Sequence, residues 1–486
     1  MRSDAREATY LRSKLACDMH NRLGLPSISA NYISLYVNDE YWGFYVLMDA
    51  PKPKWAEIEY GDADTTHLFK CKSGGLTLSS NGSNCENEND EFTDFTEWRT
   101  FIQNLDRAST IAEANTIFDV DQFLYEMAYE YLSGSWDHYL CTGHNFSVYK
   151  MPANHGGKWT MIHYDFDADF GQDVCAVEFM GDIKADKDYP SWSFDDWSTK
   201  KTHLLDILIK QDRSRFNQVM KRFVEEAFNP DILFPRIDEL KDFIRPYVQK
   251  DKTPGANGKK PGMLNESTNN DYTMAQWEAN SEFTNIGVSS SSSGYGLKFW
   301  ILNRYRKVCK DFPNITCNPE YLDLNYYYDI DRSVEGYINT KFMMPFPIFN
   351  NNPQPDNTPK TTQSQPPKPA NYQPTTRKIA TTTRAPVITS APAVPVTPPN
   401  TGSGCSVQAL GYPCCSPTNT EIVYQDENGD WGVENGNWCG ITKSSTCWSQ
   451  KLGFPCCSSC LPVILTDNDG KWSMENNDWC GIPITC

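Results

Sequence analysis

The 486-residue sequence lacks any run of eighteen apolar residues, so we expect no membrane-spanning helix. It also lacks an excess of positive charge, because 44 Lys and Arg stand against 62 Asp and Glu and leave a net charge of −18. A nucleic-acid-binding surface needs a basic face, so this charge argues against a nucleic-acid partner. Histidine is scarce as well. None of the seven has zinc-site spacing with Cys or Glu, so no zinc site is predicted.

The sequence opens without the apolar segment of a signal peptide, yet it holds 17 cysteines. Ten of these cysteines lie between Cys405 and Cys486, a density that indicates an oxidising compartment. We therefore expect a secreted, extracellular protein. We also expect that the true N-terminus, with its signal peptide, is missing from this sequence.

A helix and a hairpin are predicted around the middle of the N-terminal part. Residues 119–132 carry an apolar stripe, and Asp119 is placed to cap the start of this helix. Residues 146–150 and 158–164 alternate between apolar and polar side chains, which is typical of strands. Pro and Gly residues between the two strands predict a hairpin turn.

Polar side chains flank this hairpin at one end. Asp137 follows the predicted helix, Asn145 precedes the first strand, and Asp165 and Asp167 follow the second. Three carboxylates and one carboxamide should therefore meet at the same end of the hairpin. Oxygen ligands of this kind suit Mg²⁺, which is a hard cation.

Protein kinases use the same order of parts. An Asp takes the proton of the substrate hydroxyl, an Asn further on holds a metal ion, and an Asp after a hairpin brings the metal to the phosphates. By this order Asp137 is the candidate catalytic base, and Asn145, Asp165 and Asp167 are the candidate metal ligands. The sequence nevertheless lacks an H-R-D motif, and its Asp-to-Asn spacing is eight residues. It is therefore not an ordinary protein kinase.

The same stretch resembles the spore coat protein H (CotH) kinase family, an atypical secretory group. The likeness lies in Trp136-Asp137, in His144-Asn145 and in the D-x-D-x-x-F-G pattern of residues 165–171, and it covers residues 1–345. It implies an α+β, kinase-like bilobal domain with part of its N-terminal lobe missing from this sequence. It also implies transfer of phosphate from ATP to protein Ser or Thr, with Mg²⁺ or Mn²⁺. An inactive, kinase-like structural or binding component is the alternative.

Other residues of this domain leave alternatives open. Lys70, in a predicted strand over residues 67–72, is the best visible candidate for a phosphate-contacting Lys, and an exposed strand Lys is the alternative. His144 either orients Asn145 or Asp137 or has a structural role. Cys309 and Cys317 are close enough in sequence to pair. Residues 288–294 are predicted to be a loop.

Glycosylation sequons provide a further set of candidates. N-x-S/T occurs at Asn81, Asn145, Asn265 and Asn314. Asn145 should be buried in the site, and we therefore expect it to be unglycosylated.

Residues 346–403 differ in composition from the rest of the chain. They are rich in Pro, Thr and Ser, and they lack an apolar period. Such a segment cannot bury enough surface to fold, so we expect a disordered linker.

The C-terminal part is an internal repeat. Residues 404–442 and 446–486 share G-Y/F-P-C-C and E-N-x-x-W-C-G-I patterns, and each copy is too short for an ordinary apolar core. We therefore predict two small, disulfide-rich β modules. Both copies share four cysteines, namely Cys405, Cys414, Cys415 and Cys439 in the first and Cys447, Cys456, Cys457 and Cys480 in the second.

Comparing the copies suggests disulfide partners. Cys460 and Cys486 occur only in the second copy, so we predict that they form one bridge. The four shared cysteines should then form two bridges in each copy. Adjacent cysteines rarely pair, so each of Cys414 and Cys415 should bond to Cys405 or Cys439, and which bonds to which stays open.

The repeats resemble the fungal dockerins, which are related to a family of carbohydrate-binding modules. This resemblance implies binding to a scaffold protein of a plant-wall-degrading complex, a cellulosome, and polysaccharide binding is the alternative. On the family's pattern the binding residues are Tyr412, Asp426 and Trp431 in the first copy and Phe454, Asp467 and Trp472 in the second. Phe454 departs from the family's Tyr and loses a hydroxyl group, which puts the strength of that copy in doubt.

Overall fold

The structure is a computed structural model. It describes residues 1–3, 6–179, 186–256, 258–261, 272–289 and 292–340, and in the C-terminal part only strand segments between Tyr424 and Gly481. The chain divides into two compact units, Met1–Pro374 and Thr375–Cys486. The predicted linker at 346–403 and the sequon at Asn265 lie outside the described residues.

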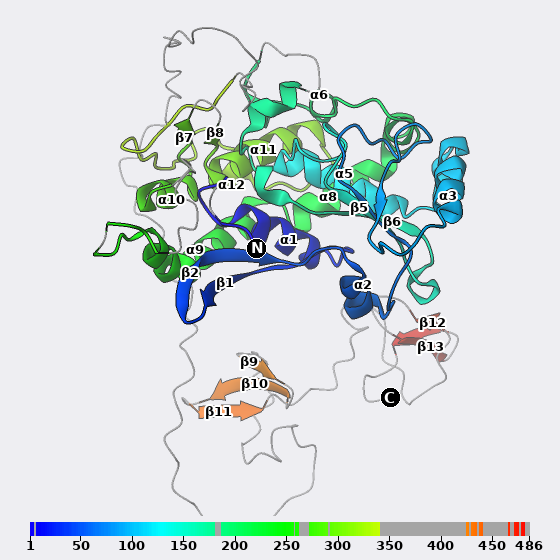
Figure 1. Ribbon diagram of the computed structural model, residues 1–486, viewed down its shortest axis with the longest axis horizontal. Coiled ribbons are helices and arrows are strands. Elements are labelled where there is room, and N and C mark those ends of the chain that lie inside the picture. Colours follow the sequence, from blue (N-terminus) through cyan, green and yellow to red (C-terminus); the bar gives the residue numbers. More distant parts are fainter. Residues whose placement is uncertain are drawn as a thin grey trace, which may run out of the picture. The chain divides into compact units, whose positions relative to one another are not determined.

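The first unit combines helices with short antiparallel sheets, which confirms the mixed α+β content (Figure 1). Its helices are α1 (Arg12–Arg22), α2 (Pro53–Tyr60), α3 (Thr96–Arg107), α4 (Ile111–Ala114), α5 (Val120–Ser133), α6 (Phe194–Trp197), α7 (His203–Leu205), α8 (Ser214–Glu226), α9 (Pro230–Lys252), α10 (Met274–Asn280), α11 (Leu297–Asp311) and α12 (Pro319–Leu322). Its strands are β1 (Ala30–Val37), β2 (Glu40–Met48), β3 (Leu68–Cys71), β4 (Glu86–Asn87), β5 (Phe146–Lys150), β6 (Trp159–His163), β7 (Ile286–Ser289) and β8 (Ser292–Gly294). Among the described residues, no helix has the length and apolarity that crossing a membrane requires.

Helix α5 forms the centre of the first unit. Asp119 caps its start by accepting a hydrogen bond from the backbone N–H of Gln122 at 3.1 Å, as the sequence predicts. Beyond its first turn the helix is buried on all sides, which is typical of a core helix rather than of a surface helix. It packs against α8, α11 and β6, and Figure 1 shows it beside β5 and β6.

The predicted hairpin is present as β5 and β6. The two strands pair antiparallel from Phe146 opposite His163 to Lys150 opposite Trp159. They belong to a four-stranded sheet of order β4-β3-β5-β6, in which β3 pairs antiparallel with β5. The sheet thus places the strand of Lys70 next to the strand that follows Asn145.

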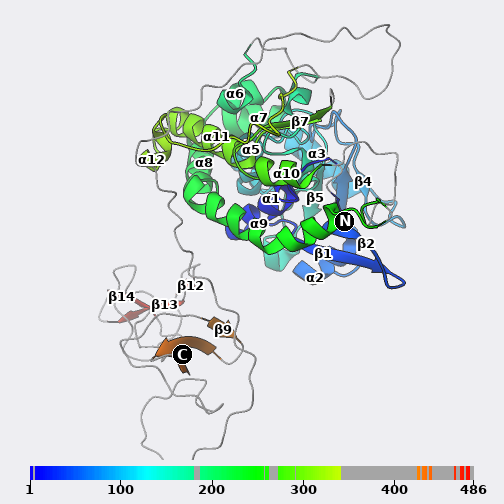
Figure 2. The same ribbon diagram turned by 90° about the vertical axis from the view of Figure 1, so that its left-hand side faces the viewer.

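A second hairpin, β1 and β2, pairs antiparallel from Ala30 opposite Met48 to Val37 opposite Glu40. Figure 2 shows α9 alongside this hairpin, and α9 contacts β2. The prediction of a loop over residues 288–294 is wrong in part, because β7 and β8 form a small two-stranded sheet there. This segment is rich in Ser and has no apolar alternation, so its sequence pattern does not indicate strands.

Two disulfides lie in the described part of the first unit. The bridge between Cys309 and Cys317 confirms the predicted pair. The bridge between Cys71 and Cys85, which joins the end of β3 to the segment just before β4, was not predicted. Disulfides are typical of proteins that fold in an oxidising compartment.

The second unit holds two three-stranded antiparallel sheets that repeat one pattern. Strands β9 (Tyr424–Asp426), β10 (Gly429–Glu434) and β11 (Asn437–Gly440) form the first, and β12 (Leu465–Thr466), β13 (Lys471–Glu475) and β14 (Asp478–Gly481) form the second. Trp431 pairs with Gly440 in the first sheet, and Trp472 pairs with Gly481 in the second. The equivalent register is what the internal repeat in the sequence predicts.

Candidate functional site

The end of the β5–β6 hairpin brings Asn145 and Asp165 together. The backbone N–H of Tyr164 donates to the carbonyl oxygen of Asn145 at 3.1 Å, which extends the strand pairing by one residue. Asn145 and Asp165 both have left-handed backbone conformations, with φ of 61° and 75°. Asn and Asp tolerate this region better than most residues, and such conformations are concentrated at functional sites.

Asp137 lies against Asn145 and His144. The amide nitrogen of Asn145 donates to the carbonyl oxygen of Asp137 at 3.0 Å and to its Oδ2 at 3.2 Å. His144 Nε2 lies 3.0 Å from Oδ1 of Asp137, and its Nδ1 lies 2.8 Å from the hydroxyl of Thr142. These contacts hold the Asp137 carboxylate from both sides. Its side chain stays 15% exposed, so it is accessible from solvent.

The hydrogen bonds around His144 also orient its ring. The hydroxyl of Thr142 donates to the carbonyl oxygen of His138 at 3.0 Å, so it receives a hydrogen bond from Nδ1 of His144. The other ring nitrogen, Nε2, is thereby directed at Oδ1 of Asp137. Of the two roles that the sequence left open, the structure therefore favours His144 as a residue that orients Asp137.

Asp165 and Asp167 share one cation. The guanidinium group of Arg2 pairs with both carboxylates, through one nitrogen to each. Arg6 Nε lies 3.7 Å from Asp167 and 3.7 Å from Asp173. Burial lowers the pKa of Arg2, and Arg6 lowers it further. No sequence pattern indicates this pairing, because Arg2 and the two Asp residues lie more than 160 positions apart.

The third carboxylate of the D-x-D-x-D run points into the core instead. Asp169 is fully buried and accepts a hydrogen bond from the hydroxyl of Tyr129 on α5. Burial raises the pKa of Asp169 to about 7. Its carbonyl oxygen also accepts a hydrogen bond from Arg12 of α1 at 3.1 Å. Asp169 therefore ties the loop after β6 to two helices, whereas Asp165 and Asp167 face the site.

A layer of buried charge lies beneath the site. Glu126 of α5 lies 3.1 Å from His20 of α1 and 2.9 Å from His163 of β6. Burial would raise the pKa of Glu126, but His163 and His20 together lower it. The other ring nitrogen of His163 lies 3.3 Å from Glu130, whose pKa is raised well above its ordinary range by burial and by the charge on Glu126. Two adjacent buried carboxylates cannot both ionise cheaply, so Glu126 carries the charge.

Glu130 and His138 hold the loop that carries Asp137. Glu130 accepts hydrogen bonds from the backbone N–H groups of Tyr139 at 2.9 Å and Leu140 at 2.7 Å. His138 is fully buried, and its Nε2 lies 2.8 Å from the carbonyl oxygen of Tyr164. Burial lowers the pKa of His138 well below its ordinary range, and His163 lowers it further. The loop is thus attached to both α5 and the end of β6.

Two glycines allow the loops of the site to pack closely on Trp300 of α11. Gly134 ends α5 with φ of 65°, and a Cβ atom there would lie 2.0 Å from the Trp300 ring. Gly171 has φ of 78°, and a Cβ there would lie 2.5 Å from the same ring. Both positions therefore require glycine for two reasons, the backbone conformation and the space.

Lys70 lies on β3, as predicted, opposite Ser147 of β5. Its ammonium nitrogen is 4.7 Å from the centre of the Tyr164 ring, which is a cation–π distance. Tyr164 lies between β6 and Asp165. Lys70 is thus near the end of the hairpin, and its contact with phosphate stays a prediction.

The residues at the hairpin end fit Mg²⁺ or Mn²⁺ by the chemistry of their donors. Asp165 and Asp167 already bind one positive group jointly, and Oδ1 of Asn145 accepts no hydrogen bond from the described residues. Within the part of the chain that the structure describes, no three His, Cys, Asp or Glu side chains converge as a metal-binding group. Mg²⁺ is often held by one or two carboxylates together with phosphate oxygens and waters, and this donor set suits that mode.

The tail residues can be placed only in part. Asp426, Trp431 and Trp472 lie on β9, β10 and β13. Tyr412, Phe454 and Asp467 are outside the described residues. Cys439 and Cys480 lie on β11 and β14, and the other eight tail cysteines, together with every predicted bridge among the ten, are also outside them.

Arg2, Arg6 and the buried Glu126–His163 layer were not predicted from the sequence. A signal for the layer was present, because Glu126 and Glu130 lie four residues apart in a helix whose other residues from Phe123 to Leu132 are apolar or aromatic. Carboxylates on the buried face of a helix need partners, so they indicate a polar network. No local signal marked Arg2 and Arg6.

Comparison with known proteins agrees with this division of the chain. Residues 1–283 match the family described as CotH kinase protein. Residues 404–441 and 446–482 each match the family described as cellulose or protein binding domain. The two families correspond to the two resemblances that the sequence motifs indicate.

Individual relatives divide in the same way. Invasin CotH3 of Rhizopus delemar is 24% identical over 329 residues, which cover 63% of this chain and 52% of that protein. Feruloyl esterase B of Piromyces equi is 59% identical over 39 residues, 8% of this chain and 7% of that protein. The solved double dockerin from Piromyces equi Cel45A is 40% identical and covers 18% of this chain and 91% of that chain, with a TM-score of 0.12.

The chain spans about half the length of the CotH relatives that it matches. Its family match nevertheless covers more than half of the chain's own residues. The chain therefore belongs to the CotH kinase protein family, and it carries two C-terminal modules of the dockerin type.

Proposed function

We propose that the N-terminal domain transfers the γ-phosphoryl group of ATP to Ser or Thr of a protein. The arrangement at the end of the β5–β6 hairpin supports this proposal, since Asn145 is hydrogen-bonded to Asp137 just before β5, and Asp165 and Asp167 share Arg2 just after β6. The domain would be a bilobal kinase-like fold.

Each residue has a role that follows from its contacts. Asp137, oriented by His144 and Asn145, accepts the proton of the substrate hydroxyl as its oxygen bonds to the γ-phosphorus and ADP leaves. Asp165, Asp167 and Asn145 would hold Mg²⁺ or Mn²⁺, which when bound neutralises charge on the phosphates. Arg2 and Arg6 supply fixed positive charge next to the same carboxylates.

Transfer from labelled ATP tests the activity. The full chain, secreted from a fungal host, is incubated with Mg²⁺ and the proteins of a plant-wall-degrading complex, and phosphorylated residues are mapped by mass spectrometry. Asp165→Asn should abolish metal-dependent ATP binding, whereas Asp137→Asn should keep binding and lose transfer. Calorimetry that detects no ATP binding by the full chain contradicts the proposal.

An inactive, kinase-like structural component is the second candidate. The pairing of Arg2 with both Asp165 and Asp167 favours it, because a guanidinium group stands where a metal ion is needed. The two candidates differ in ATP binding. An inactive component gives the same calorimetric trace for the parent and for Asp165→Asn.

The tail would attach the domain to a scaffold protein of an extracellular complex. The matches to the cellulose or protein binding family and the 40% sequence identity with a double dockerin support this part, as does the secretion that the disulfides indicate. Two linked modules raise the local concentration of each for a common partner. Polysaccharide binding by the same modules is the alternative.

Pull-down experiments separate these partners. The full chain should bind a scaffold protein, and Trp431→Ala combined with Trp472→Ala should remove most of that binding, because aromatic anchors dominate such interfaces. Gln425→Ala, on the neighbouring strand β9, serves as the control. Retention of scaffold binding by the double variant means that the binding face is wrongly placed. Binding to cellulose in place of scaffold supports the alternative.

A further inference from the structure

Two disulfides of the first unit each enclose a glycosylation sequon. Asn81 lies between Cys71 and Cys85, and Asn314 lies between Cys309 and Cys317. The enclosed segments are short, with sequence separations of 14 and 8. Nothing in the site or in its proposed chemistry uses either loop.

Both asparagines occupy the same position in a hydrogen-bonded turn. The N–H of Gly82 donates to the carbonyl oxygen of Ser79 at 2.9 Å, which places Asn81 third in a four-residue turn. The N–H of Ile315 donates to the carbonyl oxygen of Phe312 at 3.1 Å, which places Asn314 third in its turn. A side chain at this position points away from the turn's hydrogen bond and is easily reached.

The exposure of the three described sequons separates them sharply. Asn81 and Asn314 are exposed, and neither amide makes a hydrogen bond with the described residues. Asn145 is only 6% exposed, and its amide nitrogen donates both of its bonds to Asp137. A glycan on Asn145 would replace one of these donated hydrogens and would have no room at a buried position, so the folded chain accommodates a glycan on Asn81 or Asn314 but not on Asn145.

Each exposed asparagine also borders a hollow in the surface. Asn81 lines a groove of about 900 Å³ whose walls are amide-rich and include the aromatic residues Phe92, Phe95 and Trp98. Asn314 lines a smaller hollow of about 390 Å³, together with Phe194, Arg213 and Asn217. Amide groups can bond to sugar hydroxyls, and the half-buried rings of Phe92 and Phe95 in the first groove offer apolar faces to the C–H groups of a pyranose ring.

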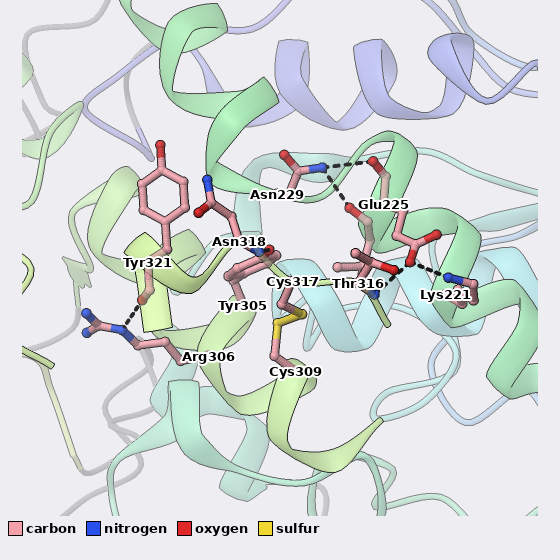
Figure 3. Close-up of a disulfide and its surroundings, with 11 residues drawn as sticks. Lys221, Glu225, Asn229, Tyr305, Arg306, Cys309, Thr316, Cys317, Asn318 and Tyr321 are labelled. Carbon is pink, nitrogen blue, oxygen red and sulfur yellow. Dashed lines mark hydrogen bonds and ion pairs between the residues drawn. A yellow bond between two sulfur atoms is a disulfide. The ribbon is translucent and has the colours of Figure 1, made fainter. Parts of the chain in front are cut away.

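The segment closed by the Cys309–Cys317 disulfide is hydrogen-bonded to the neighbouring helix α8 through Thr316 (Figure 3). The N–H of Thr316, the hydroxyl residue of this sequon, donates to Glu225 of α8 at 2.7 Å, and the N–H of Asn318 donates to the hydroxyl of Tyr305 at 2.8 Å. A group attached to Asn314 therefore starts from a fixed point beside its hollow.

We propose that Asn81 and Asn314 carry N-linked oligosaccharides whose first sugars lie in these two hollows, and that Asn145 is unmodified. In the covalent step the amide nitrogen of Asn bonds to C1 of N-acetylglucosamine. The bond from C1 to the diphosphate of a lipid-linked oligosaccharide donor breaks, the diphosphate leaves with the electron pair, and the amide loses one proton. The oxidising compartment that forms the two disulfides is the one in which this donor is used.

Mapping of glycopeptides from the full chain, secreted by a fungal host, tests the modification. Enzymatic removal of N-glycans turns a modified Asn into Asp, so Asn81 and Asn314 should appear as Asp and Asn145 as Asn. The Asn81→Gln and Asn314→Gln variants should each lose the mass of one glycan. Asn84→Gln and Asn217→Gln, which change other asparagines of the same two hollows, should lose none.

Two results would overturn the proposal. An unmodified Asn81 or Asn314 refutes the proposal for that site. A glycan on Asn145 shows that burial in the folded chain does not determine which sequons are modified. The seating of the first sugars has its own readout, because glycans held in the hollows should be removed several-fold more slowly from native than from denatured protein. Equal rates of removal mean that the sugars project into solvent.

Discussion

The carboxylates around the β5–β6 hairpin fall into two groups that lie close together and differ in surroundings. Asp137 and Asp165 reach solvent, with side chains 15% and 34% exposed, and their partners are cations and amides at the surface of the site. Glu126 and Glu130 are fully buried on α5, and their partners are histidine rings and backbone N–H groups. The exposed carboxylates thus provide the reactive groups of the site, and the buried carboxylates support the loops that carry them.

The difference shows how burial assigns roles among like groups. A carboxylate that must take a proton from a substrate has to be reachable, and its partners must be replaceable. A carboxylate in the core has to be satisfied permanently, because an unpaired buried charge is costly. Removing the first kind should therefore cost activity, and removing the second kind should cost stability.

The largest effect is expected from Asp137→Asn. The variant removes the proposed proton acceptor and keeps the size of the side chain, so kcat should fall by about 10²- to 10⁴-fold. The free energy of unfolding should change by less than about 1 kcal/mol, because the pair with His144 is partly exposed. Steady-state kinetics and denaturant unfolding measure the two quantities.

Asp242→Asn is the matched control for this experiment. Asp242 lies on α9 with a side chain 83% exposed, outside the site, and its replacement should change neither quantity. If Asp137→Asn loses stability and activity in parallel, Asp137 belongs to the supporting group, and the comparison between the two groups fails.

Glu126→Gln should have the next largest effect, and it should act on stability. The change leaves the rings of His20 and His163 without their shared charge partner, and it should lower the free energy of unfolding by about 3 kcal/mol. Glu239→Gln is the control, because Glu239 pairs with Arg236 at 2.7 Å on an exposed face of α9. It should cost less than about 1 kcal/mol.

The loss from Glu126→Gln should depend on pH. The lowered pKa of Glu126 gives stability that is present above its ordinary value of 4.5 and is lost as the pH falls through the folded value. Burial would lower the pKa of His20, but the charge on Glu126 outweighs it and raises that pKa. This contribution is present below 6.5 and is lost as the pH rises through the raised value. The gap between parent and variant should therefore be widest from about pH 4.5 to 6.5, and a gap that is constant from about pH 3 to 9 contradicts the charged pair.

The helix and hairpin of the site could be predicted from the sequence because their causes are local. Asp119 and the apolar stripe define α5, and alternating side chains with a Gly-rich turn define β5 and β6. Once the hairpin is known, the closeness of Asn145 and Asp165 follows from strand pairing alone. The Cys309–Cys317 bridge was predictable for the same reason, since its two residues are close in sequence.

The parts that escaped prediction depend on contacts between distant residues. The position of Arg2 on Asp165 and Asp167 is set by the path of the N-terminal segment, which an isolated β-bridge from Arg2 to Val46 of β2 fixes. The inward turn of Asp169 depends on where the Tyr129 hydroxyl lies. The D-x-D-x-x-F-G pattern sets Asp169 apart from Asp165 and Asp167, but it does not indicate that the side chain of Asp169 is buried against α5.

A smaller effect, on the affinity for a divalent cation, is expected from replacing Arg2. It tests whether Arg2 and a metal ion compete for the same carboxylates. Arg2→Met removes the guanidinium group that pairs with Asp165 and Asp167, so a divalent cation no longer competes with it. Affinity for Mn²⁺ in the absence of nucleotide should rise by about 5- to 10-fold, or about 1 kcal/mol. Arg99→Met, which removes a guanidinium group on α3 that lies over the ring of Phe95, should leave this affinity unchanged. Calorimetric titration with Mn²⁺ that shows weaker binding by Arg2→Met contradicts the competition.

The smallest effect is expected at Lys70, and it decides between the two interpretations that the sequence left open. Lys70 lies over the Tyr164 ring, one strand away from Asn145, and a cation there can reach a phosphate at the hairpin end. Lys70→Met keeps the apolar stem of the side chain and removes its charge, so KM for ATP should rise by about 3- to 5-fold with kcat nearly unchanged. Lys72→Met provides the control, because Lys72 pairs with Glu86 at 2.6 Å in an exposed position on the same segment. If KM for ATP is the same in Lys70→Met as in Lys72→Met, Lys70 is an exposed strand residue. Another Lys must then contact the nucleotide.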